Sequence, residues 1–137
     1  MDEKGSSKAA NETVMGETAR PRLKEGMVPP DTGIYLRVEE GMGTGRIITV
    51  SAGGVYVIGR EGADIVLDDV KASRKHAEIG FYGPGAYVIR DLASTNGTFL
   101  NSRRVSEKAK LANNDLIRIG ETLLRLTVVE DSIPLSR

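Results

Sequence analysis

The feature that most constrains this chain is a succession of short apolar segments separated by glycine, asparagine and aspartate. Turn signals recur roughly every 8–12 residues, and no segment carries a sustained helical periodicity, which is typical of an all-β sandwich or barrel. The pattern predicts about ten or eleven short strands. The clearest of them cover residues 34–39, 46–50, 55–58, 65–67, 76–81, 86–91, 98–100, 103–105, 116–120 and 122–129.

The first 31 residues differ in composition from the rest of the chain. They contain three of the five prolines and no aromatic residue. Such a stretch cannot bury enough apolar surface to offset the entropy lost on ordering. We therefore expect a flexible, disordered N-terminal tail over residues 1–31, one β domain over residues 32–130, and a C-terminal linker over residues 131–137.

Composition excludes several functional classes. The chain has no cysteine and a single histidine, and Asp64, Asp68 and Asp69 do not match a calcium-loop pattern, so we expect no metal and no cofactor. Lys+Arg and Asp+Glu are equal at 19 each, which gives no general argument for direct nucleic-acid binding by this domain. The sequence has neither an apolar run of membrane-spanning length nor a secretory signal, so we predict no membrane segment and a cytoplasmic location.

Three polar segments stand at the ends of predicted strands. Gly59-Arg60 ends one strand, Ser73-Arg74-Lys75-His76 precedes another, and Ser94-Thr95-Asn96-Gly97 forms a turn. Each segment alone is typical of a solvated arginine or a plain turn. Together they bring cations, hydroxyls and an amide to connections that one fold could gather at one end, where binding residues usually lie. Such groups can hold a phosphate.

The order Gly-Arg, Ser-x-x-His and Asn-Gly on a run of short strands resembles the forkhead-associated (FHA) domain family. The resemblance covers about residues 33–129 and includes the string Asp-Leu-Ala-Ser-Thr-Asn-Gly-Thr-Phe-Leu-Asn at 91–101. One departure is Asn101-Ser102, where many members have Asn-Gly, and it affects a hairpin turn rather than the site.

The resemblance implies an eleven-stranded β-sandwich that binds phosphothreonine peptides without catalysis and acts downstream of a serine/threonine kinase. Its implied partner is a phosphothreonine-containing protein or peptide. Lys71 would influence the choice of peptide residue three positions after the phosphothreonine, with tolerance for an acidic one. The implied roles are phosphate contact for Arg60, Ser73, Arg74 and Thr95, peptide-backbone contact for Asn96, and loop shape for Gly59, His76 and Gly97.

A hydrolase built on Ser73, His76 and Asp91 is the enzymatic alternative. Residues three apart on a strand point to opposite faces, so His76 would turn away from Ser73. The chain also lacks a Gly-x-Ser-x-Gly elbow. We therefore expect no enzyme. The pair Arg103-Arg104 stays open between an extension of the positive rim and an exposed strand pair.

Both ends of the chain raise further alternatives. Thr13 and Thr18 each follow a glutamate, and some bacterial FHA proteins carry a phosphorylated threonine in a similar tail that folds back onto the domain's own site. Phosphorylation of Thr13 or Thr18 could thus switch the module off, whereas the simpler interpretation is a solvated tail. Residues 128–136 resemble the exit from FHA domains that precede an ATPase module in bacterial enhancer-binding transcription activators. A structural interaction domain with a vacant site is a third alternative.

Overall fold

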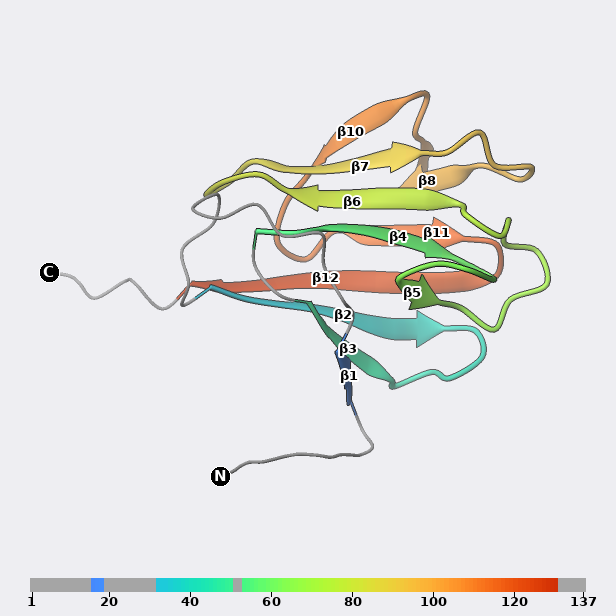
Figure 1. The fold of residues 1–137 in the computed structure, drawn as a ribbon, viewed down its shortest axis with the longest axis horizontal. Helices are drawn as coiled ribbons and strands as arrows, with labels where there is room; N and C mark the ends of the chain where they lie inside the picture. The colour runs from blue at the N-terminus through green and yellow to red at the C-terminus, as the bar shows by residue number, and fades with distance from the viewer. Residues whose placement is uncertain (1–15, 19–31, 51–52, 131–137) are drawn as a thin grey trace, which may run out of the picture.

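The computed structural model describes residues 16–18, 32–50 and 53–130 (Figure 1). These residues form twelve strands and no helix. The strands are β1 (Gly16–Thr18), β2 (Thr32–Glu40), β3 (Ile47–Val50), β4 (Val55–Gly59), β5 (Ile65–Val66), β6 (Ala77–Phe81), β7 (Tyr87–Asp91), β8 (Thr98–Leu100), β9 (Arg103–Arg104), β10 (Lys108–Leu111), β11 (Leu116–Ile119) and β12 (Thr122–Glu130). Within the described part of the chain, no helix is long and apolar enough to cross a membrane.

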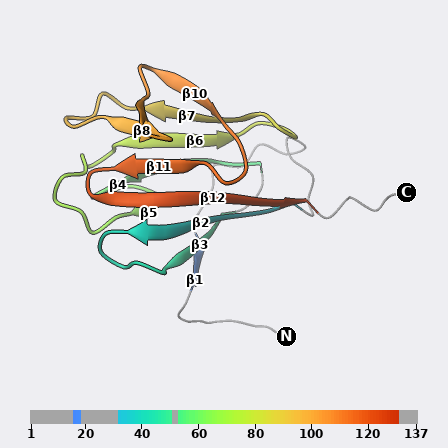
Figure 2. The same cartoon turned by 180° about the vertical axis from the view of Figure 1, so that it is seen from behind.

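The strands make two sheets that pack face to face, as the front and back views show (Figures 1 and 2). One sheet has seven strands in the order β1-β3-β2-β12-β11-β8-β9, and the other has five in the order β10-β7-β6-β4-β5. The eleven strands from β2 to β12 confirm the predicted all-β sandwich.

Alternation along the strands places one face of each sheet in the core. In β2, Ile34, Leu36 and Val38 are fully buried, and in β4 Tyr56 and Ile58 are fully buried. The two sheets thus contribute to a single apolar core. This core holds the strand ends, and therefore the loops that leave them, in fixed positions.

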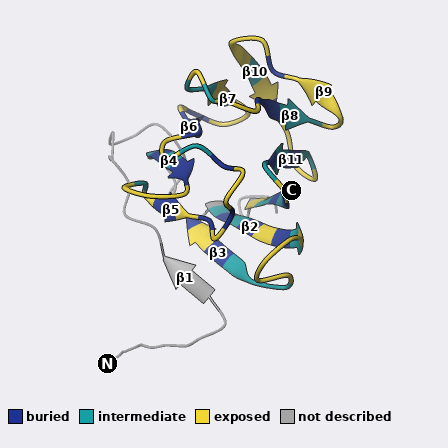
Figure 3. Ribbon diagram, turned by 90° about the vertical axis from the view of Figure 1, so that its right-hand side faces the viewer, coloured by how far each residue is buried: buried dark blue, intermediate teal, exposed yellow. Residues whose placement is uncertain are grey.

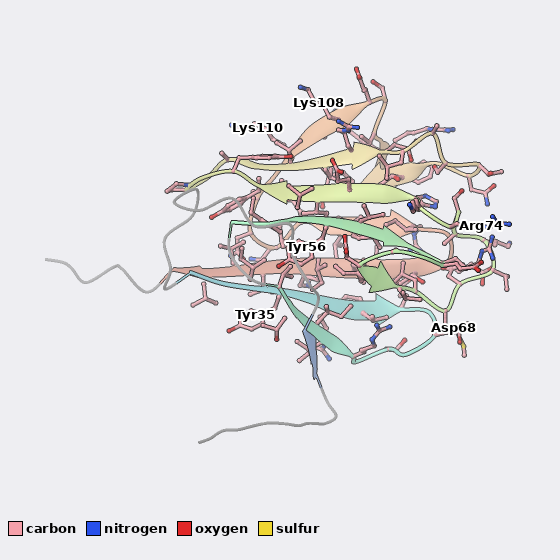
Figure 4. All side chains as sticks on the ribbon, in the orientation of Figure 1. Tyr35, Tyr56, Asp68, Arg74, Lys108 and Lys110 are labelled. Carbon is pink, nitrogen blue, oxygen red and sulfur yellow. The ribbon has the colours of Figure 1, made fainter. Side chains whose placement is uncertain are left out.

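Two strands were not expected from the sequence. The segment Lys108–Leu111 forms β10 at one edge of the five-stranded sheet, where its exposed lysines protect an otherwise open edge (Figure 4). The segment Gly16–Thr18 forms β1 inside the predicted tail and pairs in parallel with β3. The other tail residues, including Thr13, and the linker at 131–137 lie outside the described residues.

Three connections lie at the same end of the sandwich, on the right in Figure 1 and facing the viewer in Figure 3. They join β4 to β5, β5 to β6 and β7 to β8. The hairpin between β8 and β9 turns at Asn101 and Ser102, whose φ angles are 49° and 72°. Ser102 thus occupies a left-handed conformation that usually favours glycine.

Candidate functional site

Arg60 follows directly after β4 and is held by the neighbouring loop. Its backbone N–H donates to the carbonyl of Ser73 at 3.0 Å, and its Nε donates to the carbonyl of Ala72 at 3.0 Å. The nearest carboxylate contact is long, with Nη1 3.9 Å from Glu61 Oε1. The side chain is 41% exposed, so its terminal nitrogens are oriented by the loop and remain accessible to a ligand.

Gly59 allows the end of β4 to touch the segment that carries Ser73 and Arg74. A Cβ at Gly59 would overlap the Arg74 carbonyl oxygen and lie 2.6 Å from the carbonyl carbon. Only a residue without a side chain fits at this point. The close approach brings Arg60 beside Ser73.

His76 connects the two loops that carry the polar segments. The side chain is fully buried, its Nδ1 accepts the Ser73 N–H at 2.9 Å, and its Nε2 lies 2.9 Å from the Gly97 carbonyl. Because Nδ1 accepts a hydrogen bond, the ring proton is on Nε2 and donates to Gly97. The Ser73 hydroxyl oxygen accepts the Thr95 N–H at 3.0 Å. The imidazole therefore contacts the backbone of Ser73 rather than its hydroxyl, and the arrangement lacks the nucleophile–base contact of a triad.

The loop before β8 is shaped by the carboxylate of Asp91. It accepts the Ser94 hydroxyl at 2.6 Å, the Thr98 hydroxyl at 2.7 Å and the Ser94 N–H at 3.1 Å. The Ser94 hydroxyl oxygen in turn accepts the Gly97 N–H at 2.9 Å. Burial alone would raise the pKa of Asp91, but these hydrogen bonds outweigh it and hold the pKa below its ordinary value. From the sequence, Asp91 is a candidate only for a catalytic triad, so its role in shaping this loop was not predicted.

A second carboxylate, that of the buried Asp69, fixes the loop before β6. It accepts the N–H groups of Lys71 and Glu121 and the hydroxyl of Thr122, at 2.9, 2.8 and 2.6 Å. Burial opposes the charged form, yet the hydrogen bonds, that of the Thr122 hydroxyl foremost, lower the pKa of Asp69. A Cβ on Gly120, whose φ is +62°, would lie 2.6 Å from Oδ1 of Asp69. This long-range contact was not predicted from the sequence.

The remaining predicted site residues are Asn96, Lys71 and Arg74. The Asn96 Nδ2 donates to the Lys71 carbonyl at 2.9 Å, which is a further hydrogen bond between the two loops. The Lys71 Nζ lies 3.2 Å from Glu121 Oε2. Arg74 is 75% exposed, with its Nε 3.8 Å from Glu61 Oε1, and it extends from the loop end (Figure 4).

Beside Arg60 the surface is hollowed. The hollow has a volume of about 540 Å³ and is lined by Arg46, Arg60, Val66, Leu67, Asp68, Asp69 and Val70. Val70 is 86% exposed, which is unusual for an aliphatic side chain. The site end thus combines cations and hydroxyls with a small apolar surface.

The chemistry available here is anion binding. Arg60 and Arg74 provide guanidinium donors, and Ser73 and Thr95 provide hydroxyls on loops that are joined by hydrogen bonds. No group of metal-ligating side chains is found within residues 16–18, 32–50 and 53–130. Fold and site together define a β-sandwich whose loops present guanidinium groups and hydroxyls at one end.

Comparisons with known proteins identify the class. The FHA domain family model matches residues 56–120. FhaB of Mycobacterium tuberculosis is 38% identical over 92 residues, which cover 67% of this chain and 59% of FhaB. The FHA domain of CT664 from Chlamydia trachomatis is 31% identical, with a TM-score of 0.66, and the match covers 69% of this chain and 96% of that domain. The chain belongs to the FHA domain family.

A further solved structure comes from work on phosphothreonine-dependent FHA domain interactions. It is 32% identical, with a TM-score of 0.61, and the match covers 69% of this chain and 95% of that one. The chain spans about three fifths of the length of the curated relative FhaB.

Proposed function

We propose that this domain binds phosphothreonine peptides of partner proteins that a serine/threonine kinase has modified, and that it does so without catalysis. The observation that carries the proposal is the joining of three loops, which places Arg60, Ser73 and Thr95 together at one end of the sandwich. The related structure from work on phosphothreonine-dependent FHA domain interactions supports the same ligand class. The proposed setting is the cytoplasm.

The energetics suit reversible signalling. A phosphothreonine carries about −1.5 to −2 charge and three acceptor oxygens. A charge-assisted hydrogen bond contributes about 1.5–3 kcal/mol, and two or three of them, less the ordering costs, correspond to roughly micromolar binding. Asn96 is exposed next to this site and is positioned through Lys71 to meet the peptide backbone.

A titration with matched phosphothreonine, phosphoserine and unmodified peptides tests the proposal. We expect Arg60→Ala to weaken phosphopeptide binding by about 10- to 100-fold, because one charge-assisted contact contributes about 1.5–3 kcal/mol. Phosphoserine should bind about fourfold more weakly or worse, because one buried methyl contributes about 0.8 kcal/mol. Isothermal titration calorimetry measures both effects.

The matched control is Lys110→Ala, which removes the same charge from β10, away from the loop end that carries Arg74 (Figure 4). It should leave the affinity unchanged. Equal binding of the three peptides would show that the site does not recognise phosphate and would favour the vacant-site alternative. A location at the front of a longer transcription activator rests on residues 128–136, most of which lie outside the described residues, and stays an alternative proposal.

The direction of β1 favours self-inhibition by the tail as a second function. Gly16 pairs with Ile47, which follows Arg46 in the hollow beside Arg60, and Thr18 pairs with Thr49 further from that end. Because β1 and β3 are parallel, the chain enters β1 from the site end. Thr13 is three residues upstream of Gly16, and three residues span at most about 11 Å. Thr13 is therefore the better candidate than Thr18.

Phosphorylating one threonine at a time tests this second function. We expect a chain phosphorylated only at Thr13 to bind an added phosphopeptide at least about tenfold more weakly, because a tethered ligand competes at up to millimolar effective concentration. Phosphorylation only at Thr18 should have a smaller effect, since Thr18 would first have to leave β1. Unchanged affinity after phosphorylation at Thr13 would rule out self-inhibition through that residue.

A further inference from the structure

Arg104 belongs to a different strand from the predicted phosphate ligands, yet it touches their loop. A Cβ on Gly97 would lie 2.9 Å from the Cζ and Nε of Arg104 and 3.1 Å from its Nη2. The guanidinium therefore packs directly against Gly97, next to Asn96. Gly97 has a φ of +89°, so the backbone favours glycine at this position.

Arg104 has no partner for its charge among the described residues. The residue is exposed, and within the described ranges it forms no ion pair or side-chain hydrogen bond. Other cations at this end differ, since Lys71 pairs with Glu121 at 3.2 Å and Arg74 approaches Glu61 at 3.8 Å. Among the residues that the structure describes, Arg104 thus has no carboxylate to give up before it meets a ligand.

The position of Arg104 relative to the phosphate site follows from a chain of contacts. Ser73 donates to His76, His76 donates to Gly97, and Gly97 packs on Arg104. Two hydrogen bonds and one ring therefore separate Ser73 from the Gly97 backbone. An extended peptide advances about 3.3 Å per residue, so a side chain a few residues from the phosphothreonine reaches Arg104.

Arg104 and Lys71 mark different directions from the phosphate site. Lys71 extends to the turn between β11 and β12, within the seven-stranded sheet, whereas Arg104 lies on β9 at the edge of that sheet. Figure 3 shows β9 at the outer rim of the loop end. A peptide residue that meets Arg104 is thus a different residue from one that meets Lys71.

We propose that Arg104 selects an acidic residue a few positions from the phosphothreonine, on the side of the peptide remote from Lys71. The proposal rests on the proposed function and adds the chemistry of the flanking sequence. A guanidinium binds a carboxylate through paired donors, which favours aspartate or glutamate over neutral residues.

The test uses phosphothreonine peptides in which one aspartate is moved through the flanking positions of an otherwise alanine-rich sequence. The wild-type chain should prefer aspartate at one position by about three- to tenfold, the range expected for an accessible but well-oriented arginine–carboxylate pair. Arg104→Gln should abolish that preference while leaving the affinity for the all-alanine peptide unchanged. Fluorescence anisotropy provides both measurements.

Arg103→Gln is the matched control. Arg103 is the preceding residue of β9, equally exposed, and successive strand residues point to opposite faces. It should retain the aspartate preference. A preference that persists in Arg104→Gln, that is absent from the wild-type chain, or that Arg103→Gln removes equally would overturn the proposal. Loss of phosphothreonine binding in the wild-type chain would instead overturn the proposed function, so the two failures are distinguishable.

Discussion

Replacing Gly59 with alanine should lower the free energy of unfolding by about 3–5 kcal/mol, since overpacking a rigid backbone contact lies at the upper end of single-substitution effects. The new methyl group would overlap the carbonyl oxygen of Arg74, and Gly59 is buried with its own carbonyl bonded to the Leu67 N–H at 2.8 Å. The Arg74 carbonyl also accepts the Glu61 N–H at 3.3 Å, so a shift of either backbone would break a hydrogen bond. Urea denaturation followed by circular dichroism measures the loss.

The same substitution should also remove peptide binding, because the displaced segment carries Ser73 and Arg74. Gly62→Ala is the matched control in the same connection. Nothing lies within 4 Å of a Cβ at Gly62, and only its φ of +67° opposes alanine, at a cost of about 1–2 kcal/mol. Similar unfolding midpoints for the two variants would contradict the contact between Gly59 and Arg74.

The sandwich was predictable because its core strands alternate strongly. The segments around Ile34, Tyr56 and Ile117 have the two-residue period and glycine boundaries that a half-buried strand requires. Lys108–Leu111 was missed because an edge strand contributes little apolar surface, and its lysines resemble a loop. Gly16–Thr18 was missed because its pairing with β3 depends on a partner distant in sequence.

The polar segments of the candidate site could be predicted from the sequence, but the long-range contacts that hold them in place could not. The Gly-Arg, Ser-x-x-His and Asn-Gly segments are local patterns, and the structure brings them to one end of the sandwich. Asp69 instead acts through Glu121 and Thr122, more than fifty residues away along the chain. Arg104 likewise meets Gly97 only because a hairpin returns β9 beside that loop. Contacts of this kind depend on topology, which periodicity does not specify.

His76→Ala should lower the free energy of unfolding by about 3–4 kcal/mol, because it opens a cavity and leaves two buried polar groups without partners. Those groups are the N–H of Ser73 and the carbonyl of Gly97, each 2.9 Å from the imidazole. The phosphopeptide affinity of the folded variant should also fall, since Ser73 and the loop of Asn96 would lose their common support. Thermal denaturation and calorimetric titration below the melting range measure the two effects.

Two conservative variants separate the bonds of His76. In His76→Asn the side-chain oxygen can replace Nδ1 as the acceptor for Ser73, and in His76→Gln the amide N–H can replace Nε2 as the donor to Gly97. Each should have a stability between those of the wild type and His76→Ala, because each keeps one of the two hydrogen bonds. If all three variants were equally unstable, the two hydrogen bonds would make no separate contribution to stability. If His76→Ala were as stable and bound as tightly as the wild type, the imidazole would have no part in joining the loops.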